Sequence, residues 1–233
     1  LDASILKAVA DQGYTEPTPI QKASIPVIIE GKDVIGVAQT GTGKTAAFTL
    51  PLLTKLVRSK NSTHQGRVRC LILAPTRELV VQIAENVAAY SRYSGATVAT
   101  CYGGVSERPQ IAALRRGCDF LIATPGRLLD LGGQGHGDFS AVEYLVLDEA
   151  DRMLDMGFLP AINTIVRALP KERQTLMFSA TLSREIETLT KQYQREPQLI
   201  EVGRRSNPAE TVTQLLYERS EEHTSELQSH YSI

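Results

Sequence analysis

Two short polar segments, far apart along the chain, carry side chains that can bind phosphates and their metal ion. The first ends in Gly43, Lys44 and Thr45 and follows an apolar run that begins at Val34. This order predicts a buried strand, a phosphate-binding loop and the start of a helix. A helix N-terminus offers free N–H groups and a partial positive charge. A triphosphate can therefore bind there, with Lys44 on its outer phosphates and Thr45 on Mg²⁺.

The loop departs from the GxxxxGK[ST] pattern at one position, because Ala38 stands where the first glycine is expected. We expect the loop backbone to turn tightly and to direct its N–H groups inward. The alternative is a glycine-rich turn before an ordinary helix, but a buried strand in front and a helix behind argue against it. The loop residues that we expect to surround the nucleotide are Thr40, Gly41, Thr42, Gly43, Lys44 and Thr45.

The second segment is the acidic run from Asp148 to Asp151, which follows the apolar run from Tyr144 to Leu147. A nucleotide triphosphatase needs one carboxylate to hold Mg²⁺ and another to position and deprotonate water. The alternative is that these acids only cap the next helix. Because Lys44 and Thr45 are also present, we favour the catalytic interpretation for this acidic pair.

Apolar runs and helical patterns alternate along the rest of the chain, and most runs end in a tight polar turn. This alternation predicts an α/β fold with a mainly parallel sheet and helices on both faces. Ligands then collect at the carboxyl ends of the strands. Besides the first strand and that at Tyr144 to Leu147, the predicted strands are Val68 to Leu73, Thr97 to Cys101, Phe120 to Ala123, Gln174 to Phe178 and Gln198 to Val202. The predicted helices lie at about 3–12, 19–30, 46–58, 77–90, 109–115 and 184–193, with a short one after Arg127.

Composition narrows the class of protein. The chain has 233 residues, 42% of them hydrophobic, and a formal charge of −1. One large domain is therefore expected, and any nucleic-acid binding must come from local donors rather than from a general basic field. The three cysteines and four histidines lack the spacing of a zinc site. No apolar run is long enough to cross a membrane and no signal peptide is visible, so we expect a cytoplasmic protein with reduced thiols.

The complete set of motifs resembles the first RecA-like domain of the DEAD-box RNA helicases, from about Leu1 to Val202. The motifs occur in the order of that family: G-Y-T-E-P-T-P-I-Q, A-Q-T-G-T-G-K-T, P-T-R-E-L, G-G, T-P-G-R, D-E-A-D and S-A-T. The resemblance implies a RecA-like P-loop NTPase domain with ATP and Mg²⁺ as ligands. The segment L-D-M-G-F from Leu154 looks bacterial, of the RhlE type.

The same resemblance implies a role for individual residues. On the nucleotide side, Tyr14 would stack on adenine, and Gln21 would read its edge with a donor and an acceptor. Lys44, Asp148 and Glu149 would serve catalysis, with Asp148 on Mg²⁺ through water and Glu149 as the general base. Three further residues, Asp151, Ser179 and Thr181, would couple the ATP state to domain closure. The motifs that grip the RNA backbone without reading bases contain Arg77, Gly104, Thr124 and Arg127. For each arginine, the alternative is an ordinary charge on a helix surface.

Two features depart from the family. A helicase of this kind closes two RecA-like domains over ATP and RNA, and the second domain, which supplies arginine fingers, is missing here. We expect residues 203–218 to be a linker and the start of that second domain. Residues 219–233 resemble the translation of a common sequencing adapter and are expected to be non-native. The parent protein would then be an RNA-dependent ATPase that unwinds short duplexes, whereas this chain alone would be nearly inactive.

Two other classes of function stay open. A scaffold that kept the fold and lost the chemistry would bind RNA or protein without turnover, but Lys44, Thr45, Asp148 and Glu149 argue against it. A DNA-directed translocase could share the same core, although Pro17 to Gln21 and the S-A-T triplet favour RNA. The glycine-rich run from Gly132 to Gly137 has no following Lys-Ser/Thr pair, so we expect a surface loop and no second nucleotide site.

Overall fold

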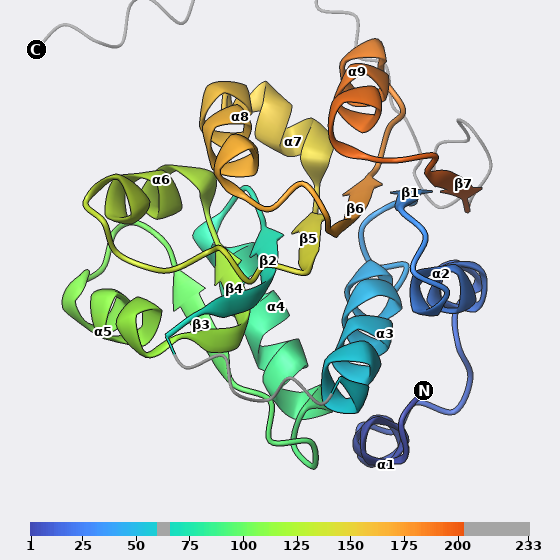
Figure 1. Ribbon diagram of the computed structural model, residues 1–233. Helices are drawn as coiled ribbons and strands as arrows, with labels where there is room; N and C mark the ends of the chain where they lie inside the picture. The colour runs from blue at the N-terminus through green and yellow to red at the C-terminus, as the bar shows by residue number, and fades with distance from the viewer. Residues whose placement is uncertain (60–65, 203–233) are drawn as a thin grey trace, which may run out of the picture. The chain divides into compact units, whose positions relative to one another are not determined.

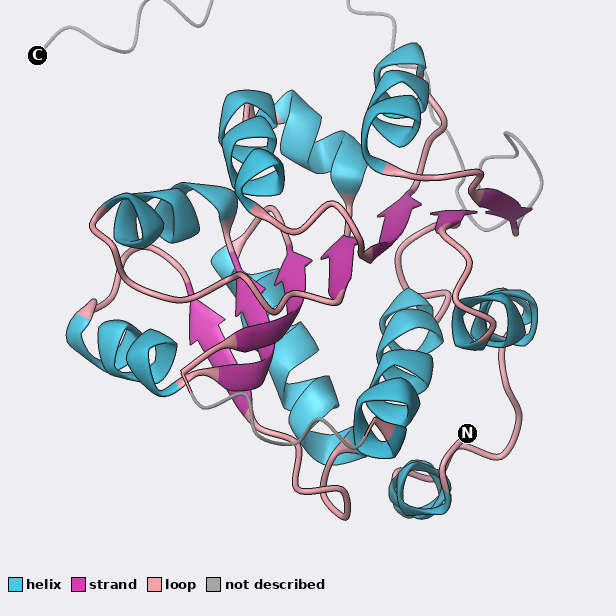
Figure 2. Cartoon of the chain, in the orientation of Figure 1, coloured by secondary structure: helices cyan, strands magenta, loops and turns pink. Residues whose placement is uncertain are grey.

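A seven-stranded sheet forms the centre of the fold in the computed structural model, which describes residues 1–59 and 66–202. Every strand pairing in this part of the chain is parallel. Figure 1 and Figure 2 show the strands side by side with helices on either side. Their order is β3 (Val98–Cys101), β4 (Cys118–Ala123), β2 (Val68–Leu73), β5 (Tyr144–Leu147), β6 (Gln174–Ser179), β1 (Val34–Val37) and β7 (Gln198–Glu201). The predicted mainly parallel α/β fold is confirmed.

The helices divide between the two faces according to their place in the chain (Figure 1). The first four helices pack on one face: α1 (Ala3–Asp11), α2 (Pro19–Ile29), α3 (Lys44–Arg58) and α4 (Arg77–Tyr90). The other face carries α5 (Arg108–Arg116), α6 (Pro125–Gly133), α7 (Ala150–Asp155), α8 (Leu159–Ala168) and α9 (Arg184–Tyr193). Each sheet face therefore has its own hydrophobic core.

The strands supply both cores by alternating their side chains. In β2, Leu71 and Leu73 join the core under α5 to α9, whereas Cys70 and Ile72 join the core under α1 to α4. All six residues of β2 are buried. A strand covered on both faces must be largely apolar on both faces. This is why β2 has no solvent-exposed polar side.

A buried polar network holds the amino ends of β1 and β6 against the segment before β7. The carboxylate of Asp33 accepts hydrogen bonds from the backbone N–H groups of Thr175 and Arg195, both at 2.8 Å. The side-chain amide of Gln194 donates to the carbonyl oxygens of Val34, at 2.8 Å, and Thr175, at 2.9 Å. Burial raises the pKa of Asp33, while the two N–H groups oppose that shift. These contacts join three strands that are far apart in sequence.

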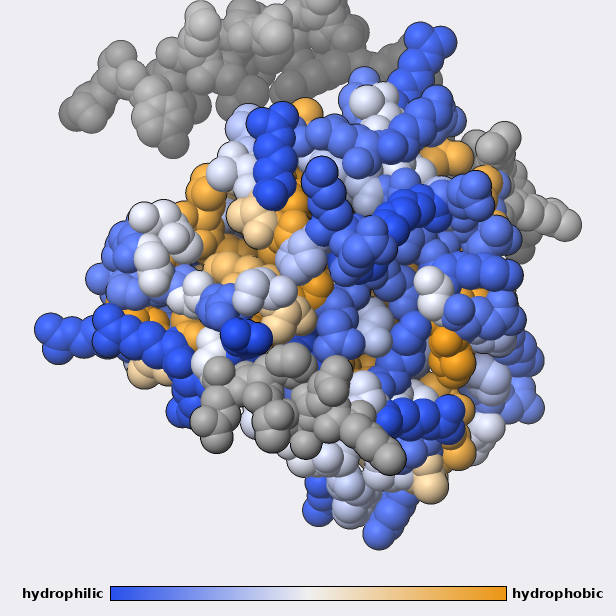
Figure 3. All heavy atoms as spheres, viewed as in Figure 1, coloured by the Kyte–Doolittle hydropathy of each residue, from blue (hydrophilic) through white to orange (hydrophobic). Residues whose placement is uncertain are grey.

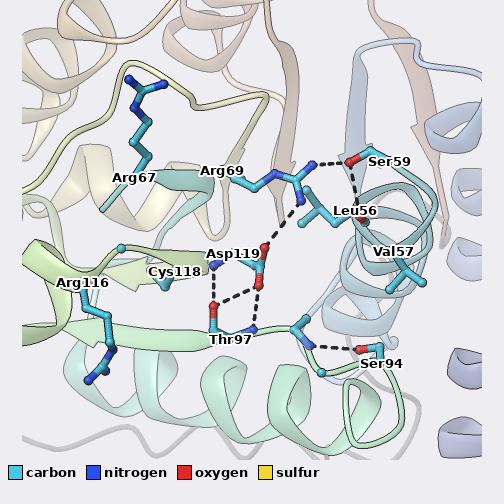
Figure 4. A pocket seen from close by; sticks show the side chains of 13 residues that line it. Leu56, Val57, Ser59, Arg67, Arg69, Ser94, Thr97, Arg116, Cys118 and Asp119 are labelled. Atoms are coloured by element: carbon cyan, nitrogen blue, oxygen red, sulfur yellow. Dashed lines mark hydrogen bonds and ion pairs between the residues drawn. The ribbon is translucent and has the colours of Figure 1, made fainter. Parts of the chain in front are cut away.

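A cavity of about 400 Å³ also lies at the amino ends, next to β2 and β4 (Figure 4). The buried Arg69 crosses it, donates to Ser59, and contacts Asp119 at 3.5 Å and Glu143 at 2.9 Å. Two carboxylates therefore balance the charge of Arg69. This arrangement is typical of a structural ion-pair network rather than an anion-binding site.

One local expectation was wrong in part. The run from Gly132 to Gly137 was expected to be a surface loop, and residues 134–137 do lie outside regular structure, but Gly132 and Gly133 are the last two residues of α6. The helix keeps going because its apolar side packs through Leu128 and Leu131, which are buried in the core, and this packing outweighs the low helix propensity of glycine. Beside it, the face that carries α6 and α8 shows a hydrophobic area (Figure 3), with a hollow of about 260 Å³ lined mainly by apolar residues.

The predicted linker at 203–218 and the predicted non-native tail at 219–233 lie outside the described residues. Within 1–59 and 66–202, no helix has the length and hydropathy that a membrane crossing requires. Cys70, Cys101 and Cys118 are buried and unpaired, and burial raises the pKa of each thiol.

Candidate functional site

The carboxyl edge of the sheet receives the predicted site residues in two adjacent groups. The strand order is β3-β4-β2 followed by β5-β6-β1. The first three strands lead into the four residues expected to grip RNA, and the next three lead into the phosphate loop, the acidic pair and the S-A-T segment. The order of strands in space thus separates two functions that are interleaved in the sequence.

The phosphate loop has the expected backbone. Gly43 has φ of 90° and ψ of 21°, a left-handed conformation, and is the N-cap of α3. A Cβ at Gly43 would lie 2.5 Å from the side-chain nitrogen of Gln21, so only glycine fits here. The buried Lys44 donates from Nζ to the carbonyl oxygen of Ala38 at 2.9 Å. Ala38 uses its backbone N–H to bond Ser179, so its departure from glycine leaves the loop intact.

The acidic pair, Asp148 and Glu149, directly follows β5 and lies across the cavity from the phosphate loop. Asp148 is 2% exposed, and burial raises its pKa to about 6, although the charge of Lys44 acts in the opposite direction. Glu149 takes φ of 50° and ψ of 51°. This left-handed conformation is strained for a residue with a side chain. One Glu149 carboxylate oxygen accepts from Arg152 at 3.2 Å.

One cavity, of about 480 Å³, contains both segments. Lys44 and Thr45 line it together with Asp148 and Glu149, and Tyr14 and Gln21 also line it. This volume is within the usual range for small-molecule sites. These residues are far apart in the sequence, but the fold places them all along the lining of one cavity.

Gln21 already makes two hydrogen bonds at this cavity. Its Oε1 accepts from the N–H of Thr18 at 3.0 Å, and its Nε2 donates to the carbonyl oxygen of Gly43 at 3.2 Å. The amide keeps one N–H and one acceptor site, which is the pair needed to read an adenine edge. Tyr14 is half exposed, and its hydroxyl lies 3.2 Å from that of Tyr90.

Sequence reasoning missed part of the cavity wall, and its placement of Thr42 at the nucleotide stays a prediction. Gln82, Asn86 and Tyr90 line the cavity from α4. Their spacing of four residues, which places them on one helix face, was the available signal. Thr42 was expected at the nucleotide but is not among the lining residues. Its hydroxyl turns back to donate to the carbonyl oxygen of Gln39 at 2.7 Å.

The S-A-T segment meets the acidic turn as expected. One carboxylate oxygen of Asp151 accepts from the N–H groups of Ala180 and Thr181, both at 3.1 Å, and from the Thr181 hydroxyl at 3.2 Å. Ser179 does not contact Asp151 in these hydrogen bonds, but its hydroxyl accepts from the N–H of Thr181 at 3.4 Å. The end of β6 is thereby tied to the start of α7.

The four residues expected to contact RNA lie on three neighbouring strand ends. Arg77 is exposed, with its guanidinium 5.3 Å from the ring centre of Tyr102. A Cβ on Gly104 would lie 4.0 Å from that guanidinium. Thr124 is the N-cap of α6, and Arg127, three residues on, is 17% exposed and lies 3.9 Å from Asp130. The structure therefore brings Arg77 and Gly104 together, and it places Thr124 and Arg127 on the adjoining strand end.

The comparisons with known proteins agree with this geometry. The profile of the DEAD/DEAH box helicase family matches residues 18–189, which include the phosphate loop and the acidic pair. The chain belongs to the DEAD/DEAH box helicase family. The assignment to a RhlE-type subgroup stays a prediction.

Individual members of the family are closely similar. The chain is 46% identical to an ATP-dependent RNA helicase RhlB from Pseudomonas aeruginosa, over 93% of this chain and 56% of that protein. It is 48% identical to DEAD-box ATP-dependent RNA helicase 30 from Arabidopsis thaliana, over 86% of this chain and 34% of that protein. Among solved structures, a DEAD box protein from Methanococcus jannaschii matches with a TM-score of 0.80 and 38% identity, over 86% of this chain and 54% of that one.

A helicase structure from Sulfolobus tokodaii agrees, with a TM-score of 0.78 and 37% identity, over 87% of this chain and 57% of that one. The RecA-like fold of these DEAD-box domains is therefore the fold of this chain. The chain spans about half the length of the RhlB relative.

Proposed function

We propose that this chain is the ATP- and RNA-binding first half of an ATP-dependent RNA helicase. The observation that carries the proposal is the single cavity that Lys44, Thr45, Asp148 and Glu149 share with Tyr14 and Gln21. Its lining offers a cation, an acidic pair, an aromatic ring and an amide. These are the groups that a nucleoside triphosphate with its metal requires.

The donor set fits Mg²⁺. This ion is usually held by one or two carboxylates together with substrate phosphates and water. Thr45 and Asp148 supply a hydroxyl and a carboxylate at the same cavity. The described residues contain no cluster of three or more His, Cys, Asp or Glu side chains that would hold a metal by protein alone. Mg²⁺ bound here would neutralise charge on the phosphates of ATP.

Each catalytic side chain then has one task. Lys44 would balance charge on the outer phosphates, and Asp148 would hold the hydrated metal. Glu149 would accept a proton from the attacking water, since this residue lines the cavity beside Asp148. Gln21 and Tyr14 bind adenine through the remaining amide groups and the ring face. The contact of Asp151 with Ala180 and Thr181 gives the acidic turn a direct connection to the segment that senses domain closure.

On the RNA side, Arg77 and Arg127 would bind phosphates, with Gly104 and Thr124 allowing the backbone to approach. Such contacts are independent of base sequence. The near-neutral charge of the chain fits this local mode of binding. In the full-length protein, a second RecA-like domain would close over both sites and add arginine fingers.

The first test uses nucleotide binding by this chain. We expect a fluorescent ATP analogue with Mg²⁺ to bind weakly and Lys44→Ala to abolish that binding. In a full-length protein that restores the second domain, Lys44→Ala should remove ATP turnover. Glu149→Gln should bind ATP and RNA but not hydrolyse ATP. Normal turnover by either variant would contradict the assigned roles.

A DNA-directed translocase is the alternative that shares this core. The ATPase of the full-length protein should rise with single-stranded RNA and much less with DNA of the same sequence. Equal stimulation by both would favour the translocase. Stimulation by neither, with intact RNA binding, would favour a scaffold.

A further inference from the structure

The β3–α5 loop, residues 102–107, connects the edge strand β3 to α5 beside the proposed RNA contacts. Residues 103–107 are exposed, whereas Gln110, in the first turn of α5 after the loop, is only 7% exposed. A buried amide next to an exposed loop has to satisfy its hydrogen bonds locally. The contacts of Gln110 therefore show what holds this loop.

Gln110 closes the loop at both ends. Its Oε1 accepts from the N–H of Tyr102 at 3.0 Å, and its Nε2 donates to the Tyr102 carbonyl oxygen at 3.1 Å. The second N–H of the same amide group donates to the carbonyl oxygen of Ser106 at 3.1 Å. Both amide hydrogens and the oxygen are thus used on the loop backbone. Because β3 is the edge strand, Gln110 takes the place that a neighbouring strand would have at Tyr102.

The closed loop in turn contacts both arginines expected to bind RNA. The ring of Tyr102 lies under the guanidinium of Arg77, with 5.3 Å from the ring centre to the guanidinium carbon. The carbonyl oxygen of Val105 accepts from Arg127 at 3.4 Å. Arg77 comes from α4 and Arg127 from α6. The loop is therefore the element that the two side chains share.

We propose that Gln110 and Tyr102 are positioning residues for RNA: Gln110 fixes the shape of the β3–α5 loop, and the loop holds Arg77 and Arg127 for the phosphate backbone. A cation over an aromatic face and a guanidinium on a carbonyl oxygen restrict two long side chains before RNA arrives. Less side-chain entropy is then lost on binding. This inference rests on the proposed RNA binding by the same edge of the sheet.

The test measures RNA affinity against salt concentration, using this chain and a fluorescent oligouridylate. Gln110→Leu keeps the size of the side chain but removes all three hydrogen bonds. We expect the RNA affinity to fall by roughly three- to thirtyfold. The slope of log affinity against log salt concentration should become shallower by up to about one unit, the equivalent of one lost phosphate contact. Affinity for the fluorescent ATP analogue should not change. The matched control is Gln192→Leu, because Gln192 lies on α9, away from the loop, and its side-chain amide donates to Asn163.

A second pair of variants leaves Gln110 in place. Tyr102→Phe keeps the ring under Arg77 and should bind RNA like the unmodified chain. Tyr102→Leu removes the ring and should lower both the affinity and the salt slope. Combining Gln110→Leu with Arg77→Ala should cost less than the sum of the two single changes, because both act on the same contact.

The outcomes distinguish failure of the proposed RNA site from failure of the positioning role alone. If the unmodified chain does not bind RNA, the proposed RNA site fails and this inference fails with it. If it binds, but Gln110→Leu and Tyr102→Leu keep its affinity and slope, only the positioning role is wrong. If Gln110→Leu weakens ATP and RNA binding equally, Gln110 has a general structural role and the inference is overturned.

Discussion

At the scale of single residues, Asp148 shows how burial and a neighbouring cation compete. Burial raises its pKa to about 6, and the charge of Lys44 reduces that rise. A carboxylate with this pKa is ionised at neutral pH and can hold Mg²⁺, but it takes up a proton in mild acid. The buried charge of Asp148 therefore costs some stability of the empty fold, and it would give the proposed Mg²⁺ site a desolvated ligand.

We predict that Mg²⁺-dependent binding of the ATP analogue weakens as pH falls through about 6. Protonated Asp148 cannot hold the ion, so the affinity at pH 5 should be about tenfold lower than at pH 7.5. Titration of nucleotide binding between pH 5 and 8 measures this. Because the nucleotide phosphates also titrate, the comparison is with Asp148→Asn, which should bind weakly and lack this component. An identical pH profile in both proteins would contradict the prediction.

The same shift has a consequence for folding. The folded-state pKa of about 6 exceeds the ordinary value of 3.8. The folded state therefore holds this proton up to a higher pH than the unfolded state does. The contribution of Asp148 to stability is complete below the ordinary value and is lost as pH rises through about 6. Asp148→Asn should therefore raise the melting temperature of the nucleotide-free chain at pH 7.5 and change it little at pH 4. A lower melting temperature at pH 7.5 would contradict the assignment of a destabilising buried charge.

At the scale of elements, the two edges of the sheet use polar groups differently. The amino edge holds its strands together with buried side chains that bond backbone groups, as Asp33 and Gln194 do. The carboxyl edge leaves charged groups at an open cavity, and Glu149 even has a strained backbone there. Stability and function are therefore located at opposite ends of the same strands.

We predict that Asp33→Ala lowers the free energy of unfolding by about 1–3 kcal/mol, because it leaves the buried N–H of Thr175 and the partly buried N–H of Arg195 without their acceptor. Nucleotide affinity of the folded fraction should not change, since Asp33 lies at the edge away from the cavity. Urea unfolding measures the first effect and nucleotide titration the second. The matched control is Glu85→Ala, an exposed acid within α4, which should stay within about 0.5 kcal/mol of the unmodified chain. A similar loss in both variants would show that the Asp33 network contributes nothing special.

At the scale of the whole molecule, the strand order divides one edge between two ligands. The ends of β3, β4 and β2 carry the proposed RNA contacts, and the ends of β5 and β1 line the proposed nucleotide cavity. β2 and β5 are neighbours, so the two sites adjoin along the edge. In the proposed full-length protein, a second domain closing over this edge would cover both ligands at once.

We therefore predict a large difference between this chain and a full-length protein. Because an arginine finger alone contributes roughly three to five orders of magnitude in rate, ATP hydrolysis by this chain should be slower by at least about a thousandfold. Measurement of phosphate release at saturating RNA checks this. An equal rate in both would show that the described half is catalytically complete.

The sequence by itself determined the fold class, the strand ends and the chemical groups of the site. Short continuous apolar runs encode the buried strands and period-3.6 apolar patterns encode the helices, and Gly43 or Pro19 encode a particular turn or helix start. This is why the predicted strands differ from the observed ones by only a residue or two, as at Thr97 and Val202. The glycines of α6 misled the prediction, because their local preference was overruled by packing of Leu128 and Leu131.

Only the tertiary structure decided which of these groups meet. Lys44 and Asp148 line one cavity because β1 and β5 are separated in the sheet by a single strand, β6. No local sequence pattern specifies this strand order. The contribution of α4 to that cavity and the hold of Gln110 on the β3–α5 loop depend in the same way on contacts between distant segments. The local sequence determines the backbone conformation of each segment. Which segments become neighbours in space depends on how both faces of the sheet are covered, and that depends on the whole chain.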